Sequence, residues 1–446
     1  MNHGFFRRTS LGLIMCAGSA LAADGAMDLS FGMNGIARTG ASDAGGYAAL
    51  AISSTDGSIV TCSTRGRLSA TFEDFYVARF SQDGLPDLAF GQAGSTTIDF
   101  DQHEDLCSGV AIQPDGLIVL AGTERIPQVF GFGWTRIAVA RLDASGNLDP
   151  TFGAGTGKVI VEFGGRQSSA AAVALQADGK ILVAGRARVG DSAQKVDFAV
   201  VRLLADGSLD TSFGVLGMAT AGFHDDDSFD YGNDMAVDDE GRIVVVGIAN
   251  GHAGIARFLP DGQLDTSFDG DGLSDFGSSA ATFVLPTCVV LQGNGQIVFA
   301  GSDGHVALVR LDESGSPDAG FGEQGVATVP FDLTIPANES AQDLVRQSDG
   351  KLVLVGNARY GDSDWSSALA ARVSPAGILD PTFGENGKAV FTFGLSEIDS
   401  QLFTAVGIAN GRILAAGGAI VGDDEVSFDS VVVRLDNDRM FVDGFE

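Results

Sequence analysis

This chain of 446 residues contains 62 glycines and carries a formal net charge of −31, from 58 acidic and 27 basic residues. Aspartate supplies 46 of the acidic residues, and because Asp and Gly favour turns over helices, the composition argues against a mainly helical protein. A charge this negative repels phosphate groups and anionic lipids, so we expect no nucleic-acid partner and no membrane insertion, while 45% hydrophobic residues exclude a disordered chain.

Residues 1–23 have the pattern of a secretory signal peptide. Arg7 and Arg8 form a positive segment, residues 11–18 form a short apolar segment, and Ala20-Leu21-Ala22 forms a cleavage site. An ordinary N-terminal strand is the alternative, but small apolar residues running directly into Asp24-Gly25 favour cleavage near Ala22. We therefore expect a bacterial protein that is secreted or periplasmic.

Three sequence markers then recur seven times in the same order, which indicates an internal repeat. One complete copy shows the first marker as Asp178-Gly179-Lys180-Ile181-Leu182-Val183-Ala184-Gly185, the second as Arg202 at the end of an apolar run, and the third as Leu209-Asp210-Thr211-Ser212-Phe213-Gly214. The turn glycines of the first marker are Gly57, Gly116, Gly179, Gly241, Gly295, Gly350 and Gly411. The spacing of 54 to 63 residues suits a unit of four short strands.

The unit over residues 157–217 contains four β-rich runs, at 158–163, 171–176, 180–184 and 198–203, with Asp178-Gly179 as a hairpin turn. Seven such units predict an all-β protein, a seven-bladed β-propeller of four-stranded antiparallel blades. An open β-solenoid is the alternative. Residues 24–37 lack the strand that should precede them and residues 428–436 supply it, so we expect the two termini to close the ring. The single propeller domain is expected over 24–439, with a C-terminal tail over 440–446.

These motifs resemble the delta-60 repeats of bacterial proteins, a β-propeller family without an established general activity. The resemblance rests on D-G-K-I-x-V-A-G at 178–185 and L-D-x-x-F-G at 209–214, and it covers almost all of the chain after residue 23. It implies the propeller fold and export, and it implies no particular activity.

The repeated Arg stands eight residues before an Asp in six units, which predicts a structural clasp rather than a ring of anion-binding groups. We expect this clasp to hold the turn between one blade and the next through bidentate hydrogen bonds, and the repeated Phe to be a wedge between blades. In the seventh unit, ring closure offers Asp28. The predicted pairs are Arg79–Asp87, Arg141–Asp149, Arg202–Asp210, Arg257–Asp265, Arg310–Asp318, Arg372–Asp380 and Arg434–Asp28.

Cysteines 62, 107 and 288 remain after signal cleavage, and an odd number permits at most one intramolecular disulfide and one free thiol. Each lies in an apolar run, so a small buried hydrophobic side chain is the default expectation. No spacing suggests a redox or metal-binding pair.

Alternation of strand direction places the two nearly uniform turns of every unit on one face and the two variable connections on the other, the variable-loop face, where specificity usually lies. Its aromatic and histidine side chains are the candidate ligand contacts: His103, Trp134, His224, Tyr231, His252, Tyr360 and Trp365. An acidic run there suggests calcium, the one cofactor the sequence offers, held by Asp225, Asp226, Asp227 and Asp230, with a solvated acidic turn as the alternative.

No hydrolase, metalloprotease, P-loop or dinucleotide-binding motif is present in the sequence. We expect a monomeric binding or scaffold protein that contacts an unidentified protein or glycan through the variable-loop face. The enzyme alternative is a propeller hydrolase or lyase acting on a glycan or ester, with His224 or His103 beside an Asp as acid and base. A purely structural role in the cell envelope is the third hypothesis.

Overall fold

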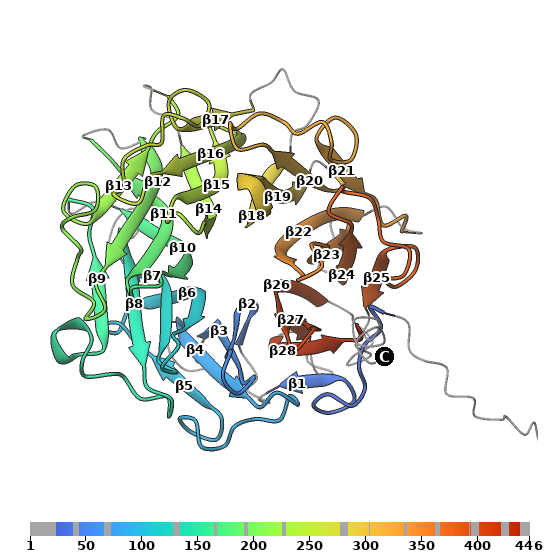
Figure 1. The fold of residues 1–446 in the computed structure, drawn as a ribbon. Coiled ribbons are helices and arrows are strands. Elements are labelled where there is room, and N and C mark those ends of the chain that lie inside the picture. The colour runs from blue at the N-terminus through green and yellow to red at the C-terminus, as the bar shows by residue number, and fades with distance from the viewer. Residues whose placement is uncertain are drawn as a thin grey trace, which may run out of the picture.

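The computed structural model describes residues 24–38, 44–66, 73–127, 134–164, 167–190, 195–224, 229–276, 284–302, 304–333, 337–361, 366–391, 393, 401–420 and 428–437. The predicted signal peptide and the predicted tail lie outside these ranges. The described chain forms seven four-stranded antiparallel sheets around a central axis, so the predicted seven-bladed propeller is confirmed (Figure 1).

The blades follow one another along the chain, innermost strand first. Blade 1 contains β2 (Ala44–Ile52), β3 (Ile59–Gly66), β4 (Glu73–Phe80) and β5 (Ser95–Ile98); blade 2 contains β6 (Glu104–Ile112), β7 (Ile118–Ile126), β8 (Trp134–Leu142) and β9 (Lys158–Val161); blade 3 contains β10 (Ser168–Leu175), β11 (Ile181–Arg188), β12 (Val196–Leu203) and β13 (Met218–Ala221). Blade 4 contains β14 (Asp230–Val237), β15 (Ile243–Ala249), β16 (His252–Phe258) and β17 (Leu273–Asp275).

Blade 5 contains β18 (Leu285–Leu291), β19 (Ile297–Ser302), β20 (Val306–Leu311) and β21 (Val326–Val329); blade 6 contains β22 (Ala337–Arg346), β23 (Leu352–Tyr360), β24 (Ser366–Val373) and β25 (Lys388–Phe391). Blade 7 contains β26 (Gln401–Ala409), β27 (Arg412–Ile420), β28 (Phe428–Leu435) and β1 (Ile36–Arg38). Two single-turn 3-10 helices, η1 (Gly153–Gly155) and η2 (Gly293–Gly295), lie in turns. Among the described residues, no helix is long and apolar enough to cross a membrane.

The strand phase predicted for the repeat is wrong by one strand. The expected first strand of the unit, at 158–163, is β9, which pairs with β8 (Val139 opposite Val159) and completes blade 2. The Leu-Asp-x-x-Phe-Gly turn therefore joins the third and fourth strands of one blade. The shorter connection that follows β9, residues 162–167, is the one that crosses to the next blade. The sequence repeat and the structural blade have the same length and different starting points.

Both termini build blade 7, as predicted. Strand β1 pairs with β28, with Ile36 opposite Val433, and the two strands lie side by side at the junction between the blue and red ends of the ribbon (Figure 1). Before β1, the Asp28 amide donates to the Arg434 carbonyl oxygen at 2.8 Å, and the Gly25 amide donates to the Asp436 carbonyl oxygen at 2.7 Å. This pairing completes blade 7 and closes the ring with strands from both ends of the chain.

The repeated Phe lies between blades. Phe213 of blade 3 has no exposed surface, and its ring lies against Gly262 in the turn before β17 of blade 4, where an added Cβ would be 3.0 Å from the ring. A larger residue at this glycine would collide with the ring. The same Phe is fully buried in every unit, at Phe31, Phe90, Phe152, Phe213, Phe268, Phe321 and Phe383.

The glycine that ends the first marker has a packing reason. In blades 2 to 7 the innermost strand contains a one-residue β-bulge, which brings its backbone onto the second strand. A Cβ at Gly185 would lie 2.0 Å from the Ser169 carbonyl oxygen, and one at Gly122 would lie 2.0 Å from the Leu106 carbonyl oxygen. Blade 1 has Ser63 at this position, and its innermost strand has a wider irregularity between Ala44 and Ala48.

Candidate functional site

The seven innermost strands (β2, β6, β10, β14, β18, β22 and β26) stand around the central axis (Figure 1). Their side chains line a cavity of about 580 Å³. Each of these strands starts at the variable-loop face. The lining comes mainly from the middle of these strands and from the ends of β7 and β11, so the cavity extends from the middle of the channel to its variable-face end. We call it the channel cavity. Its wall carries hydroxyl and amide side chains together with small residues, so it suits a polar ligand.

Two arginines and one aromatic residue lie at the open end of the channel cavity. The guanidinium carbon of Arg186 lies 4.5 Å from the centre of the Tyr231 ring, a cation–π contact between β11 and β14. Arg125 at the end of β7 forms an ion pair with Glu104 at the start of β6. Arg125 and Arg186 are both exposed. The mouth therefore offers positive charge and an aromatic surface in a protein that is otherwise strongly acidic.

Much of the wall's polarity serves to join the blades. Three bulge residues of the innermost strands donate to carbonyl oxygens of the following blade: Asn233 Nδ2 to Pro286 at 2.8 Å, Thr287 Oγ1 to Ala341 at 2.9 Å, and Thr404 Oγ1 to Ala48 at 2.7 Å. These bonds tie neighbouring innermost strands together around the channel. The positions vary in sequence, which is why the repeat markers did not reveal them.

Two carboxyl groups follow such bulges and face the same cavity. Asp234 accepts from the Val289 amide at 2.8 Å, and Asp343 accepts from the Val406 amide at 2.7 Å, in each case across a blade junction. Burial raises the pKa of both carboxyl groups to about 7. Burial, together with the negative charges of these two carboxyl groups, raises the pKa of the Cys288 thiol well above its usual range. This free cysteine is therefore not a thiolate nucleophile.

The raised pKa values of Asp234 and Asp343 predict a pH-dependent stability. Because the folded-state pKa of about 7 lies above the ordinary value of 3.8, the folded state holds more protons between pH 4 and pH 7, and the free energy of unfolding falls as pH rises through this window. Between pH 5 and pH 8.5 each of the two groups contributes about 2 pKa units at about 1.4 kcal/mol per unit, so the double variant Asp234→Asn/Asp343→Asn should gain about 5 kcal/mol relative to the parent, measured by chemical denaturation in chelator. Parallel pH profiles for the two proteins would contradict this.

The structure does not bring the seven predicted ligand residues to one cavity. Tyr231 lines the channel cavity, whereas Trp134 at the start of β8 is 48% exposed and Tyr360 at the end of β23 contacts the Ser367 hydroxyl at 3.0 Å. His252 begins β16 and is half-buried. Trp365 lies outside the described residues.

The two histidines proposed as acid and base each face a carboxylate. His103 Nδ1 lies 2.6 Å from Glu124 Oε1, and Glu124 is fully buried and also accepts from Arg136 Nε at 2.7 Å. His224 Nε2 lies 3.4 Å from Asp275 Oδ2. Neither histidine belongs to the described lining of the channel cavity.

The predicted calcium site is only partly described. Asp225, Asp226 and Asp227 lie outside the described residues. Asp230 is fully buried, and its two oxygens accept from the Phe223 amide and the Asn250 amide, both at 3.1 Å. These bonds fasten the connection from β13 into β14, so the Asp230 carboxylate has a structural task whether or not calcium binds.

Sequence reasoning missed that other blades contain the same bond, in which a side chain near the start of the innermost strand accepts a Phe backbone amide. In four innermost strands, one of the first three residues accepts a backbone amide from a Phe at the end of the preceding blade: Asp105 from Phe100, Asp230 from Phe223, Glu339 from Phe331, and Gln401 from Phe393. The donor–acceptor separations of five, seven, eight and eight residues vary, and three residue types serve as acceptor. A search for Phe followed by an acidic or amide residue before each innermost strand would have found the pattern.

The predicted Arg–Asp pairs are in contact, with a geometry that differs from the expectation. Arg141 Nε donates to Asp149 Oδ2 at 2.8 Å, while its Nη2 donates to the Thr151 hydroxyl at 2.9 Å and its Nη1 donates to the Ala205 carbonyl oxygen of blade 3. The guanidinium also lies 4.7 Å from the centre of the Phe152 ring. The expected bidentate bond to Asp is therefore wrong, because the second donor goes to a hydroxyl. The clasped turn lies within a blade, and the third donor reaches the next one.

Five segments of the chain match a family model described as "Domain of unknown function (DUF5122) beta-propeller", namely residues 113–152, 176–213, 241–268, 292–321 and 347–383. Each segment runs from a hairpin turn to the repeated Phe, once in each of blades 2 to 6. The chain is thus a repeat protein of the β-propeller type. No curated protein matches the sequence.

Solved structures with a similar fold include a polysaccharide lyase, Uly1, at 14% identity and a TM-score of 0.47, covering 93% of this chain and 97% of the lyase. An acylaminoacyl peptidase from Pyrococcus horikoshii gives 11% identity and 0.44, covering 94% and 56%, and the Bacillus subtilis arabinanase Arb43A gives 13% and 0.33, covering 74% and 93%. At these identities and scores the likenesses carry no argument about activity.

Proposed function

We propose that this chain is a delta-60 repeat protein that works outside the cytoplasm, in the periplasm or after secretion, as a binding protein. Its ligand site is the channel cavity at the variable-loop face, and the ligand class that the lining fits best is a glycan. The observation that carries the proposal is the mouth of this cavity, where Arg186 and Tyr231 form a stacked pair above a wall of hydroxyl and amide groups.

The chemistry of that mouth supports a sugar ligand. Arg186 lies over the half-buried Tyr231 ring, and the exposed Phe229 ring stacks on it with the ring centres 6.3 Å apart. The free parts of these rings offer apolar surface for the C–H side of a sugar, and the exposed guanidinium groups offer hydrogen-bond donors to hydroxyl or carboxylate oxygens. Polar side chains within a cavity of about 580 Å³ leave room for one or two sugar units. An exposed segment of a partner protein is the second class of ligand, and the binding assay below includes it.

The test is a binding screen with neutral and uronate-containing oligosaccharides on an array, with a peptide library as a second arm, followed by titration calorimetry. We expect Tyr231→Ala and Arg186→Ala each to weaken binding at least tenfold with little change in melting temperature. Val215→Ala, a 75% exposed residue in a uniform turn of the opposite face, is the matched control. Binding that survives both cavity variants, or that is lost in the control, would overturn the proposal. Binding to peptides alone would replace the glycan by a protein segment.

A hydrolase or lyase is the second candidate, and one observation favours it. Asp234 and Asp343 bring carboxyl groups with a pKa of about 7 into the channel cavity, and a general acid needs this property. Against it, each carboxylate is already held by backbone amides, and the described lining contains no histidine. Incubating the bound glycan with the protein and analysing the products by mass spectrometry separates the two candidates: cleavage abolished by Asp234→Asn/Asp343→Asn would favour the enzyme.

A further inference from the structure

Three carboxylates from separate strands meet at the junction of blades 1 and 2. Asp74 is the second residue of β4, Asp99 follows the last residue of β5, and Asp105 is the second residue of β6. One carboxylate oxygen of each lies within 4.8 Å of those of the other two. Two oxygens bound to one calcium ion at about 2.4 Å each lie at most about 4.8 Å apart, so these carboxylates can share one ion.

A second observation is that one buried carboxylate oxygen of this cluster has no hydrogen-bond donor. Asp105 has no exposed surface, and while its Oδ2 accepts from the Phe100 amide at 2.6 Å, its Oδ1 has no hydrogen-bond partner. A buried carboxylate oxygen without a donor is costly, and two further carboxylates beside it add repulsion. The Lys158 ammonium donates to the backbone carbonyl oxygen of Asp99 at 2.8 Å, and one carboxylate oxygen of Asp99 accepts from the Gln102 amide at 2.7 Å.

We propose that Asp74, Asp99 and Asp105 bind a calcium ion that joins blade 1 to blade 2 at the variable-loop face. All the ligand atoms are oxygens, as a hard divalent cation requires, and they are charged, which favours calcium over a neutral guest. The ion satisfies the open Oδ1 of Asp105 and cancels the repulsion among the three carboxylates. Water completes its coordination on the side of Asp99, which is only partly buried.

The propeller contains its own comparison. At the junction of blades 3 and 4, Asp197 and Asp230 occupy the positions of Asp74 and Asp105, and Gly222 occupies the position of Asp99. That junction has two carboxylates, and both oxygens of Asp230 accept backbone amides. Of these two junctions, the first therefore provides three carboxylates and an unpaired oxygen on the inner strand, whereas the second provides two carboxylates and has its unpaired oxygen, Oδ1 of Asp197, on the third strand. The same arrangement makes Asp197→Asn a matched control.

The ion has a structural consequence for the channel mouth. The connection between β5 and β6 carries His103 and leads into Glu104, the partner of Arg125 at the channel cavity. Fixing Asp99 and Asp105 to one ion fixes both ends of this connection. The site is independent of the proposed glycan binding, because none of its three carboxylates lines the cavity.

The experiment uses the mature chain, stripped with chelator, in titration calorimetry and thermal unfolding with calcium chloride alone. We expect one binding event that is lost or weakened more than tenfold in Asp99→Asn and in Asp105→Asn. At a hundredfold excess over Kd, the melting temperature of the parent should rise by about 3 °C. In chelator, Asp105→Asn should melt no lower than the parent, since Asn keeps the acceptor for Phe100 and removes the unpaired charge. Asp197→Asn should keep the full calcium response.

Three results would overturn the proposal. The first is the absence of heat and of any melting shift when calcium is added to the parent. The second is an unchanged calcium response in Asp99→Asn. The third is a response that survives both variants and disappears in Asp225→Asn/Asp226→Asn, which would place the ion in the acidic run instead. Glycan binding measured in chelator is a separate readout, so failure here does not bear on the proposed function.

Discussion

Replacing Arg372 by Ala should cost about 3–5 kcal/mol of folding free energy and lower the melting temperature by about 5 °C. Its side chain is 2% exposed and makes four polar contacts: Nε to Asp380 at 2.8 Å, Nη2 to Asp24 at 2.9 Å and to Thr382 at 2.9 Å, and Nη1 to Asn437 at 2.6 Å. Removing the guanidinium takes the ion-pair partner from the buried Asp24 carboxylate and leaves Asp380 with Lys351, whose Nζ lies 3.0 Å away. Thermal and denaturant unfolding measure the loss.

We expect this large loss of folding free energy because Arg372 joins both termini to blade 6. Asp24 precedes β1 and Asn437 follows β28, so one guanidinium holds the start and the end of the described ring. Although burial raises the pKa of Asp380, hydrogen bonds from Thr382 and Lys351 and the charge of Arg372 lower it overall, which keeps the carboxylate ionised. The variant should therefore unfold by opening the ring closure first.

Arg79 is the matched control from the same position of blade 1. Its side chain is 17% exposed, its Nε lies 3.2 Å from Asp87, and Asp87 is 29% exposed. Exposed ion pairs contribute at most about 1 kcal/mol, so Arg79→Ala should change the melting temperature by about 1 °C. Arg202→Ala, a buried clasp without a contact to either terminus, should lie between the two. Equal losses at Arg79 and Arg372 would refute a role set by burial and ring closure.

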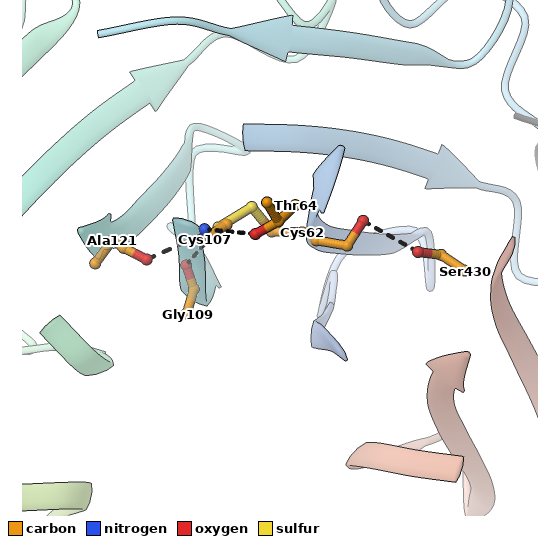
Figure 2. The surroundings of a disulfide bond; sticks show 7 residues. Cys62, Thr64, Cys107, Gly109, Ala121 and Ser430 are labelled. Carbon is orange, nitrogen blue, oxygen red and sulfur yellow. Dashed lines mark hydrogen bonds between the residues drawn. A yellow bond between two sulfur atoms is a disulfide. The ribbon is translucent and has the colours of Figure 1, made fainter. Parts of the chain in front are cut away.

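Reducing the disulfide between Cys62 and Cys107 should cost about 4 kcal/mol, from the entropy that a cross-link across 45 residues removes from the unfolded chain. The bond joins Cys62 on β3 of blade 1 to Cys107 on β6 of blade 2, as Figure 2 shows. Gly109 and Ala121 lie beside Cys107 in this view. Next to Cys62, the hydroxyl of Ser63 contacts the Ser430 hydroxyl of blade 7 at 3.0 Å. The segment therefore links three consecutive blades.

The measurement compares the melting temperature of the parent with and without reductant, where we expect a drop of about 4 °C. The double variant Cys62→Ala/Cys107→Ala should have the melting temperature of the reduced parent, and reductant should not change it. Cys288→Ala keeps the disulfide and removes the buried free thiol, so it should keep the full response to reductant. A parent that is insensitive to reductant after verified reduction would show that the inter-blade packing alone holds this junction.

The Cys62–Cys107 bond also shows where sequence reasoning stopped. Counting cysteines allowed one disulfide, yet the default expectation of small buried hydrophobic side chains is wrong for Cys62 and Cys107 and correct for Cys288. No local pattern distinguishes the three, because the bond depends on β3 and β6 lying at adjacent positions in two different blades. The same reason hid the cluster of Asp74, Asp99 and Asp105, whose members belong to three strands.

Of the candidate site, the sequence supplied the face and one residue of the cavity. Tyr231 was expected as a ligand contact and lines the channel cavity, but Arg186, Asn233 and Asp343 were not singled out. These side chains meet because the innermost strands of different blades converge on the axis, and their positions carry no shared residue type. His103 and His224 were candidates by type alone, and the fold directs them to Glu124 and Asp275.

By itself, the sequence determined the blade number, the four-stranded unit, the closure by both termini, the contacts of Arg with Asp and the place of the repeated Phe between blades. Each of these features depends on a short sequence motif that recurs in the repeats. The tertiary structure alone decided which strand completes which blade, which cysteines pair, which carboxylates meet and which side chains face the channel. The physical reason is that these features depend on contacts between strands that are far apart in the chain and that the ring brings together. A single residue in one blade can make such a contact, so no repeated motif reveals it in the sequence.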